Sequence, residues 1–258
     1  FFVNWDGEKQ QLHITELPPL PMPLDNLSAT YADGCLYVAG GKGKPQTVPI
    51  GQDGSQTAPT NPLFSLQLTP SLQKEWVRLP DFPGPARVQP VLTAQQSEDG
   101  IRLYLAGGFQ PASAHQEAIV CTDMLSYHPK TKQWRNEGFL PSLAGGSHRT
   151  VTGGCAIASG DSSILLVGGV NHDRFRDALN HPEPDYLLHP ADWYKFNTSL
   201  LQYNTFTKHW THLGNYEELA RAGAGIANNA NTVIIIGGEL KPGIRTPEVN
   251  AFKLTRHP

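Results

Sequence analysis

The stretch LYLAGG, residues 103–108, joins a run of apolar residues to a pair of glycines. Three more stretches have the same form: LYVAGG at 36–41, LLVGG at 165–169 and TVIIIGG at 232–238. Their first glycines are residues 40, 107, 168 and 237, so successive pairs lie 67, 61 and 69 positions apart. A recurrence of this length indicates a repeated structural unit that is longer than the repeat of a helical solenoid.

Each unit contains four strand-forming segments in a constant order. A segment of small and apolar residues comes first, and a turn rich in Gly, Asp, Asn or Ser leads to the Gly-Gly segment. A segment of alternating character follows a loop of variable length, and a segment containing Trp closes the unit. Tyr127 and Trp134 are seven residues apart, as are Tyr203 and Trp210, which predicts one register for the last two segments. We name the four strands a to d, from the inside outward.

Four antiparallel strands per unit, repeated radially, predict an all-β fold of the β-propeller class. The small residues of strand a suit the crowded centre, where the inner strands converge. We expect the Gly-Gly pairs and the Trp residues to be packing residues with no chemical role. We also expect residues 1–258 to form a single propeller domain.

The four kinds of strand are unequal in number. Residues 1–6 match strand c and residues 11–19 match strand d, so the first blade begins at its third strand. Residues 249–254 match a strand c with no strand d after it. The chain therefore holds about four and a half blades. Because open sheet edges promote aggregation, we expect upstream blades, absent from this chain, to complete the ring.

Composition narrows the classes of function. The formal net charge is −3, so no broad basic field favours a nucleic-acid partner. No apolar run approaches the ~20 residues needed to cross a bilayer, so no membrane span is expected. The three cysteines, Cys35, Cys121 and Cys155, provide no CxxC pair and no disulfide framework.

Strands a and b are antiparallel, so the starts of the a strands and the ends of the b strands lie on one face of the propeller. We call it the loop face, because it also carries the two longest insertions, residues 42–62 and 171–197. Loops held on a rigid scaffold commonly carry binding and catalytic residues. The loop face is therefore where we expect a functional site.

The second insertion, residues 171–197, has helical signals and is called the lid. Asp173 is a candidate helix cap, and Pro190 is expected to open a further turn. The lid histidines His172, His181 and His189 have spacings of nine and eight, which fit no helical or hairpin pattern of metal ligands. We therefore expect solvated histidines here and no metal.

The fourth Gly-Gly pair differs from the others in its next residue, which is an acid. That residue is Glu239, and Arg245 lies six positions further on, whereas the other pairs precede Lys42, Phe109 and Val170. Residues 241–244, KPGI, predict a type II turn that brings Arg245 back toward Glu239. Such a pair could bind an acidic substrate through the two-pronged guanidinium and transfer protons through the carboxylate. It could equally be a structural ion pair that braces the loop.

The segment GGELKPGIRTPEV, residues 237–249, together with GGVN and DWYKFN at the two ends of the lid, resembles the sialic acid mutarotases, the N-acetylneuraminate epimerase family. Members of that family are six-bladed kelch propellers, and their signature Gly-Glu-x-Lys-Pro-Gly-x-Arg-Thr is matched by residues 238–246. The signature comes late in this chain, which resembles a cyclically permuted branch whose last two blades have moved to the front. The resemblance implies a kelch-type propeller with six blades when complete.

The resemblance also implies an activity. The chain would be an isomerase that interconverts the α and β anomers of free sialic acid (N-acetylneuraminate), or of a similar 2-keto sugar acid, by acid/base ring opening without a cofactor. The catalytic Glu falls on Glu239 and the essential Arg on Arg245, while FPGPAR places Arg87 at a substrate-binding arginine. Lys241 and Asn171 are further candidates for substrate contact. Family precedent implies a periplasmic location, with a cytoplasmic one as the alternative.

The alternative function is that of a kelch module that binds a glycan or a protein on its loop face without catalysis. Such a module would be expected to show an apolar or aromatic patch there, and the sequence offers only scattered Phe109, Tyr186 and Trp193. The fold does not decide between these functions, because propellers host many activities.

Overall fold

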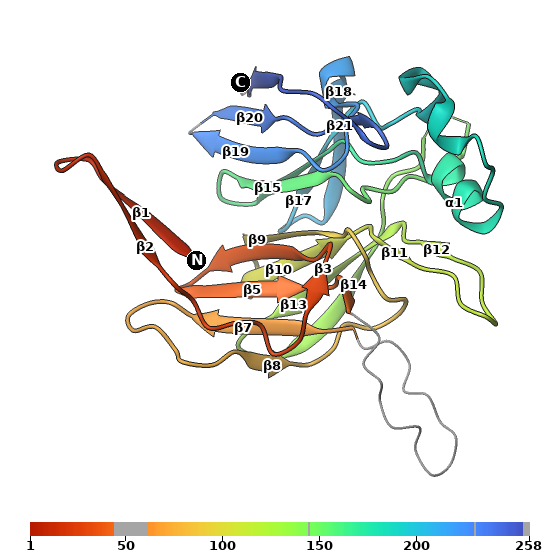
Figure 1. Cartoon of the computed structure of the whole chain (residues 1–258). Coiled ribbons are helices and arrows are strands. Elements are labelled where there is room, and N and C mark those ends of the chain that lie inside the picture. The colour runs from red at the N-terminus through yellow and green to blue at the C-terminus, as the bar shows by residue number, and fades with distance from the viewer. Residues whose placement is uncertain (44–60, 144, 230, 255–258) are drawn as a thin grey trace, which may run out of the picture.

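Antiparallel sheets of the same strand order follow one another along the chain in the computed structural model (Figure 1). The structure describes residues 1–43, 61–143, 145–229 and 231–254. Most of the first insertion, residues 44–60, therefore lies outside the described residues. Among the helices described, none is long and apolar enough to span a membrane.

Three sheets contain four strands each, in the spatial order a, b, c, d. The first comprises β4 (Ser28–Ala32), β5 (Cys35–Ala39), β7 (Leu63–Gln67) and β8 (Val77–Leu79). The second comprises β9 (Val91–Ser97), β10 (Gly100–Ala106), β13 (Asp123–His128) and β14 (Gln133–Phe139). The third comprises β15 (Cys155–Ser159), β16 (Ser163–Val167), β17 (Ser199–Asn204) and β18 (His209–Asn215).

The two ends of the described chain form smaller sheets. The fourth sheet has three strands, β19 (Gly225–Asn229), β20 (Thr232–Ile236) and β23 (Val249–Lys253), which correspond to a, b and c. Within the described residues, strands β1 (Phe2–Asp6) and β2 (Gln11–Thr15) pair only with each other, and they project from the remaining sheets in Figure 1. The predicted all-β propeller is confirmed, and so is its uneven set of strands within the described residues. Completion of the ring by further blades stays a prediction.

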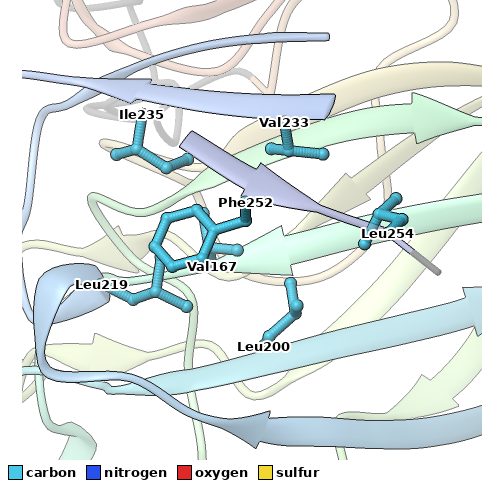
Figure 2. A pocket seen from close by; sticks show the side chains of 7 residues that line it. All are labelled: Val167, Leu200, Leu219, Val233, Ile235, Phe252 and Leu254. Atoms are coloured by element: carbon cyan, nitrogen blue, oxygen red, sulfur yellow. The ribbon is translucent and has the colours of Figure 1, made fainter. Parts of the chain in front are cut away.

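Neighbouring sheets pack face to face through three apolar clusters. The cluster between the third and fourth sheets includes Val167, Val233 and Phe252. Figure 2 shows these side chains around a small space whose lining residues are all hydrophobic. That space belongs to the core between two blades, because it offers no polar group that could orient a ligand.

The outer strands of the second and third sheets share one register, as their sequences predicted. Tyr127 lies opposite Trp134, with ring centroids 5.0 Å apart, and Tyr203 lies opposite Trp210 at 4.7 Å. Both strand pairs also shift register at the same place, after Met124 in one sheet and after Leu200 in the other. The aromatic pairs are therefore equivalent packing elements of two blades.

The first glycine of each of the first three Gly-Gly pairs lies against the backbone that leads into the next blade. All eight glycines have positive φ angles, between +61° and +102°. A Cβ atom added to Gly168 would lie 2.6 Å from the carbonyl oxygen of Arg221, and one added to Gly40 would lie 2.5 Å from that of Arg87. The next glycine, Gly169, donates a hydrogen bond to the same Arg221 oxygen at 2.9 Å. Glycine is required here by both the backbone conformation and the close approach, which confirms the expected packing role.

Backbone hydrogen bonds also join the starts of successive a strands. Gln89 N donates to Asn26 O at 2.8 Å, Gly153 N to Gln89 O at 3.0 Å, and Gly223 N to Gly153 O at 2.7 Å. This belt runs across four successive blades on the loop face. The ends of the b strands meet it, since Ala222 pairs with Glu239. The prediction that strand-a starts and strand-b ends share a face is confirmed.

A buried arginine braces the Gly-Gly pair of the second blade. The guanidinium of Arg87 donates to the carbonyl oxygen of Gly107 at 3.0 Å and to both carboxylate oxygens of Asp123 at 2.8 Å. The Arg87 side chain is fully buried, and that of Asp123 is 21% exposed. The arginine thus satisfies a carbonyl group at the point where the strand ladder ends.

The equivalent carbonyl group, that of the first glycine in the pair, also accepts a side-chain hydrogen bond in the next two blades. Arg221 donates to Gly237 O at 3.0 Å and to a carboxylate oxygen of Glu248 at 3.3 Å. In the third blade the amide of Asn197 donates to Gly168 O at 3.2 Å. The sequence places these partners far from the glycines that they cap, so only the folded chain reveals the equivalence.

Replacing Gly168 with alanine should destabilise the fold more than the same change at Gly160, which has a similar φ of +57° but no atom within 4 Å of an added Cβ. Both variants place alanine at a positive φ angle, which costs roughly 1 kcal/mol. Gly168→Ala must in addition displace the backbone at Arg221, which should add about 2 kcal/mol. Urea denaturation measures the difference, and equal losses in the two variants would contradict the close-approach argument.

Replacing Arg87 with methionine should lower the free energy of unfolding by about 3–5 kcal/mol, because Asp123 would remain largely buried without its partner. The control is Arg78→Met, which breaks the exposed Arg78–Asp81 ion pair and should cost less than about 1 kcal/mol. Denaturant titration compares the two. A loss in Arg87→Met no larger than that of the control would refute the bracing role.

Arg149 provides a second comparison on the same face. Its side chain is also buried, but its Nε and Nη1 atoms have no hydrogen-bond partner in the described part of the chain. Burial lowers the pKa of its guanidinium. Because no carboxylate would be left behind, Arg149→Met should leave the free energy of unfolding unchanged or raise it.

Candidate active site

A short hairpin after the fourth Gly-Gly pair places Glu239 beside Arg245. Strands β21 (Glu239–Lys241) and β22 (Ile244–Arg245) are antiparallel, and Glu239 lies opposite Arg245. Gly243 has a φ of +78°, the value that the third residue of a type II turn requires. The turn predicted from the sequence KPGI therefore agrees with the structure, and it returns the chain as expected.

The two side chains of the hairpin form a loose and accessible pair. Arg245 Nε lies 3.4 Å from Glu239 Oε1, and the side chains are 82% and 32% exposed, respectively. An exposed ion pair of this kind contributes at most about 1 kcal/mol. It is a weak brace for the loop, and it leaves most donors of Arg245 and one oxygen of Glu239 open to a ligand.

The backbone that carries Glu239 is held firmly. Glu239 N donates to Ala222 O at 2.7 Å, and Ala222 N donates back to Glu239 O at 3.0 Å. Thr246 N donates to Gly238 O at 2.9 Å and ties the returning strand to the glycine pair. An accessible carboxylate on a fixed backbone is suited to a catalytic or binding role, because its position is set before a ligand arrives.

The same structural position carries other side chains in the first three blades. In the first blade, β3 (Leu24–Asp25) pairs with β6 (Lys42–Gly43), which places Lys42 opposite Asp25. In the second, Phe109 of β11 (Phe109–Gln110) bridges to Val88, and β11 pairs with β12 (Ile119–Val120). In the third, Val170 is buried. Within the described residues, only the fourth copy presents a carboxylate here.

The lid begins with helix α1 (His172–Asn180), which packs beside β12. The cap of this helix is Asn171, whose side-chain oxygen accepts from Arg174 N at 3.0 Å. The prediction of Asp173 as the cap was therefore wrong by two residues, and Asp173 lies in the first turn. At the other end of α1, Asn180 exchanges two hydrogen bonds with the backbone of Ala118, at 2.7 and 3.2 Å.

The second half of the lid consists of two short 3-10 helices, η1 (Tyr186–Leu188) and η2 (Ala191–Tyr194). The turn predicted at Pro190 is present, since Pro190 caps η2. The His189 ring stacks on Trp193, with centroids 3.9 Å apart, and the Arg174 guanidinium lies 4.6 Å from the centre of the Trp193 ring. Helix η2 contacts β21, so this part of the lid lies beside the strand that carries Glu239.

The three lid histidines do not converge on one point. The expectation that they are solvated was wrong for His172, which is buried, whereas His181 is exposed and His189 is half-buried. His172 contacts Asp173 at 2.8 Å, His181 contacts Asp177 at 3.0 Å, and His189 stacks on Trp193. Within the described residues, a different group brings metal-type ligands together: Glu183, Asp185 and His189, whose ligand atoms lie within 4.8 Å of one another. Both acids are exposed, as acids commonly are without a metal. The expected absence of a metal stays a prediction.

The remaining candidate substrate residues are each engaged with the protein. Arg87 is buried against Gly107 and Asp123, which supports a bracing role. Asn171 uses its side-chain oxygen to cap α1. Lys241 donates through Nζ to the carbonyl oxygens of His189 at 2.6 Å and Leu187 at 3.2 Å. Substrate contact by these three residues stays a prediction, as does a cleft between Arg87 and the hairpin.

Sequence reasoning missed the contacts of Lys241 with the lid. The lysine belongs to the matched signature, but its partners lie more than fifty positions earlier in the chain. No local pattern indicates which carbonyl groups a lysine will reach. A hint was available in the helical signals of the lid, because the last carbonyl groups of a helical turn attract cations.

Comparison with solved structures supports the fold. The solved structure of YjhT matches with a TM-score of 0.69 and 24% sequence identity, over 93% of this chain and 67% of that one. At this level of identity the similarity bears on the architecture only.

Comparison with known sequences identifies relatives that are named N-acetylneuraminate epimerase. The protein named N-acetylneuraminate epimerase from Pasteurella multocida (strain Pm70) is 27% identical over 215 residues, which cover 78% of this chain and 52% of the relative. The protein of that name from Haemophilus influenzae (strain PittEE) is 30% identical over 242 residues, covering 88% and 60%. The chain thus spans little more than half the length of these relatives.

The family assignment follows from a match that includes the hairpin. The family model for N-acetylneuraminate epimerase matches residues 46–257, most of the chain. That range contains Glu239, Arg245 and the whole lid. With the propeller architecture and these relatives, it leads to one conclusion: this chain belongs to the N-acetylneuraminate epimerase family.

Proposed function

We propose that the protein is a mutarotase that interconverts the α and β anomers of sialic acid or a similar 2-keto sugar acid. The observation that carries the proposal is the accessible Glu239–Arg245 pair on a hairpin whose backbone is hydrogen-bonded to Ala222, next to the belt. Membership of the N-acetylneuraminate epimerase family supports the same reaction. A periplasmic location is proposed with it, on family precedent alone.

The chemistry requires one group that can accept and return a proton. The anomeric carbon of a 2-keto sugar acid bears a carboxylate, a hydroxyl and the ring oxygen. In the proposed reaction Glu239 takes the proton of the anomeric hydroxyl as the bond from the anomeric carbon to the ring oxygen breaks, and it then gives that same proton to the ring oxygen. The open ketone rotates, and closure on the opposite face reverses these transfers. No atom or electron is gained or lost overall, and general acid–base catalysis contributes roughly 10²–10⁴-fold to such a step.

In the proposed complex, Arg245 binds the carboxylate group of the sugar. Its guanidinium is mostly exposed, and the contact with Glu239 uses only Nε. The planar fork matches a carboxylate through two parallel hydrogen bonds. The 3.4 Å separation from Glu239 would place a bound carboxylate, and with it the anomeric carbon, close to the proposed base.

A non-catalytic binding module is the second candidate, and one observation favours it. Exposed apolar side chains gather on the hairpin and on the lid segment bonded to it: Leu187, Leu188, Leu240 and Ile244. Exposed apolar groups in one region commonly mark an interaction surface. The alternative predicts tight binding of a glycan or a protein with no acceleration of anomer exchange, so an assay of anomer exchange separates the two.

Glu239→Gln should lower the rate of anomer interconversion by roughly 10²–10⁴-fold, to the spontaneous rate, because glutamine has a similar shape but accepts no proton. Saturation-transfer NMR on sialic acid with the full-length protein measures this rate. Calorimetry should show that the sugar still binds. The control Glu98→Gln changes an exposed acid in the turn between β9 and β10 and should leave the rate unaltered. If Glu239→Gln keeps the full rate, the hairpin pair is structural and the catalytic role is lost.

Arg245→Lys should mainly weaken binding, because lysine keeps the charge but lacks the two-pronged geometry. We expect KM to rise about tenfold, equivalent to roughly 1.4 kcal/mol, with a smaller change in kcat. Steady-state NMR rates at several sugar concentrations separate the two constants. Arg78→Lys, at an exposed site on an outer strand, is the matched control. An unchanged KM in Arg245→Lys would remove Arg245 from the carboxylate site.

A further inference from the structure

Lys241 links the signature hairpin to the lid. It lies in β21, two residues after Glu239. Its ammonium group donates to His189 O at 2.6 Å and to Leu187 O at 3.2 Å, so two of its three donors are used. Both carbonyl groups lie at the C-terminal end of the short helix η1, where a cation is favoured.

The lid segment that Lys241 reaches, residues 183–194, has mostly local bonds of its own. Its backbone hydrogen bonds include those from Tyr186 N to Glu183 O and from Leu188 N to Asp185 O, each within a single turn. The side chains of Leu187 and Leu188 are 59% and 80% exposed. Short turns with exposed apolar residues are weakly stable alone. The buried side chain of Tyr194 holds one end of the segment, and bonds to a fixed neighbour are needed to position the part around Leu187 and Leu188.

Strand β21, to which Lys241 belongs, is held rigidly. Glu239 N and O are both bonded to Ala222, and Ala222 adjoins the belt that joins the strand-a starts. Because Lys241 lies on this fixed strand, its hydrogen bonds hold the lid in one position relative to the propeller scaffold. In return, the lid supports the strand that carries Glu239, because η2 contacts β21.

We propose that Lys241 is a positioning residue, which fixes the second half of the lid against the catalytic hairpin and contacts no substrate. The proposal rests on the proposed mutarotase function in so far as the hairpin is catalytic. It assigns the lysine of the signature a role different from that of Arg245. Arg245 presents free donors to a ligand, whereas Lys241 uses two of its three donors on the lid.

Hydrogen exchange tests the link without reference to activity. In the full-length protein, Lys241→Met keeps the aliphatic stem and removes the donors. Amides of the segment 183–194 should then exchange about tenfold faster or more, because two charge-assisted hydrogen bonds no longer oppose opening. Lys241→Arg retains donors and should stay within about threefold of the wild type. Lys74→Met, at an exposed lysine between β7 and β8, should behave as the wild type. Exchange in Lys241→Met equal to that in Lys74→Met would overturn the proposal.

Kinetics with sialic acid provide a second and separable measurement. A positioning role predicts that Lys241→Met lowers kcat about tenfold and changes KM by less than about threefold, with recovery in Lys241→Arg. A rise in KM with kcat unchanged would instead show that Lys241 binds the sugar, and would also overturn the proposal. If the wild-type protein does not accelerate anomer exchange, the proposed function fails, and the hydrogen-exchange result alone decides the role of Lys241.

Discussion

The close approach of the first three Gly-Gly pairs to the backbone of the next blade is the contact on which the rest of the structure depends. It brings a carbonyl oxygen within 2.5–2.6 Å of where a Cβ would stand at Gly40 and Gly168. That spacing excludes every residue but glycine and sets the distance between blades. The apolar clusters between the sheets can then close, and the strand-a starts come near enough to form their belt of hydrogen bonds.

This arrangement also requires a hydrogen-bond donor for the carbonyl group of the first glycine in a pair. The chain turns away from the sheet at each glycine pair, so the carbonyl group of the first glycine loses its ladder partner. Arg87, Arg221 and Asn197 supply donors to it in three successive blades. The two capping arginines are each paired with an acid, Arg87 with Asp123 and Arg221 with Glu248. Buried charges on the loop face can therefore arise from blade packing alone, and burial of an arginine there is poor evidence for a substrate site.

The hairpin that carries Glu239 and Arg245 contrasts with these braces. It occupies a position that recurs in every blade, so its backbone is as fixed as the scaffold. Its side chains are accessible and weakly paired. A rigid backbone with uncommitted charged groups suits proton transfer, because little reorganisation is needed when the substrate binds. The lid lies against the same strand, and Lys241 donates hydrogen bonds from that strand to the lid.

Much of this protein is determined locally in the sequence. The repeated glycine pairs, the turns and the Tyr–Trp spacing predicted the strand order, the register and the hairpin that joins Glu239 to Arg245, because each depends on residues close to one another in the chain. The partners of Arg87 and Lys241 were decided only by tertiary structure. Asp123 lies 36 residues from Arg87, and His189 lies 52 residues from Lys241. The radial packing of blades and the placement of the lid bring those groups together, and a long charged side chain bonds to whichever acceptor packing leaves within its reach.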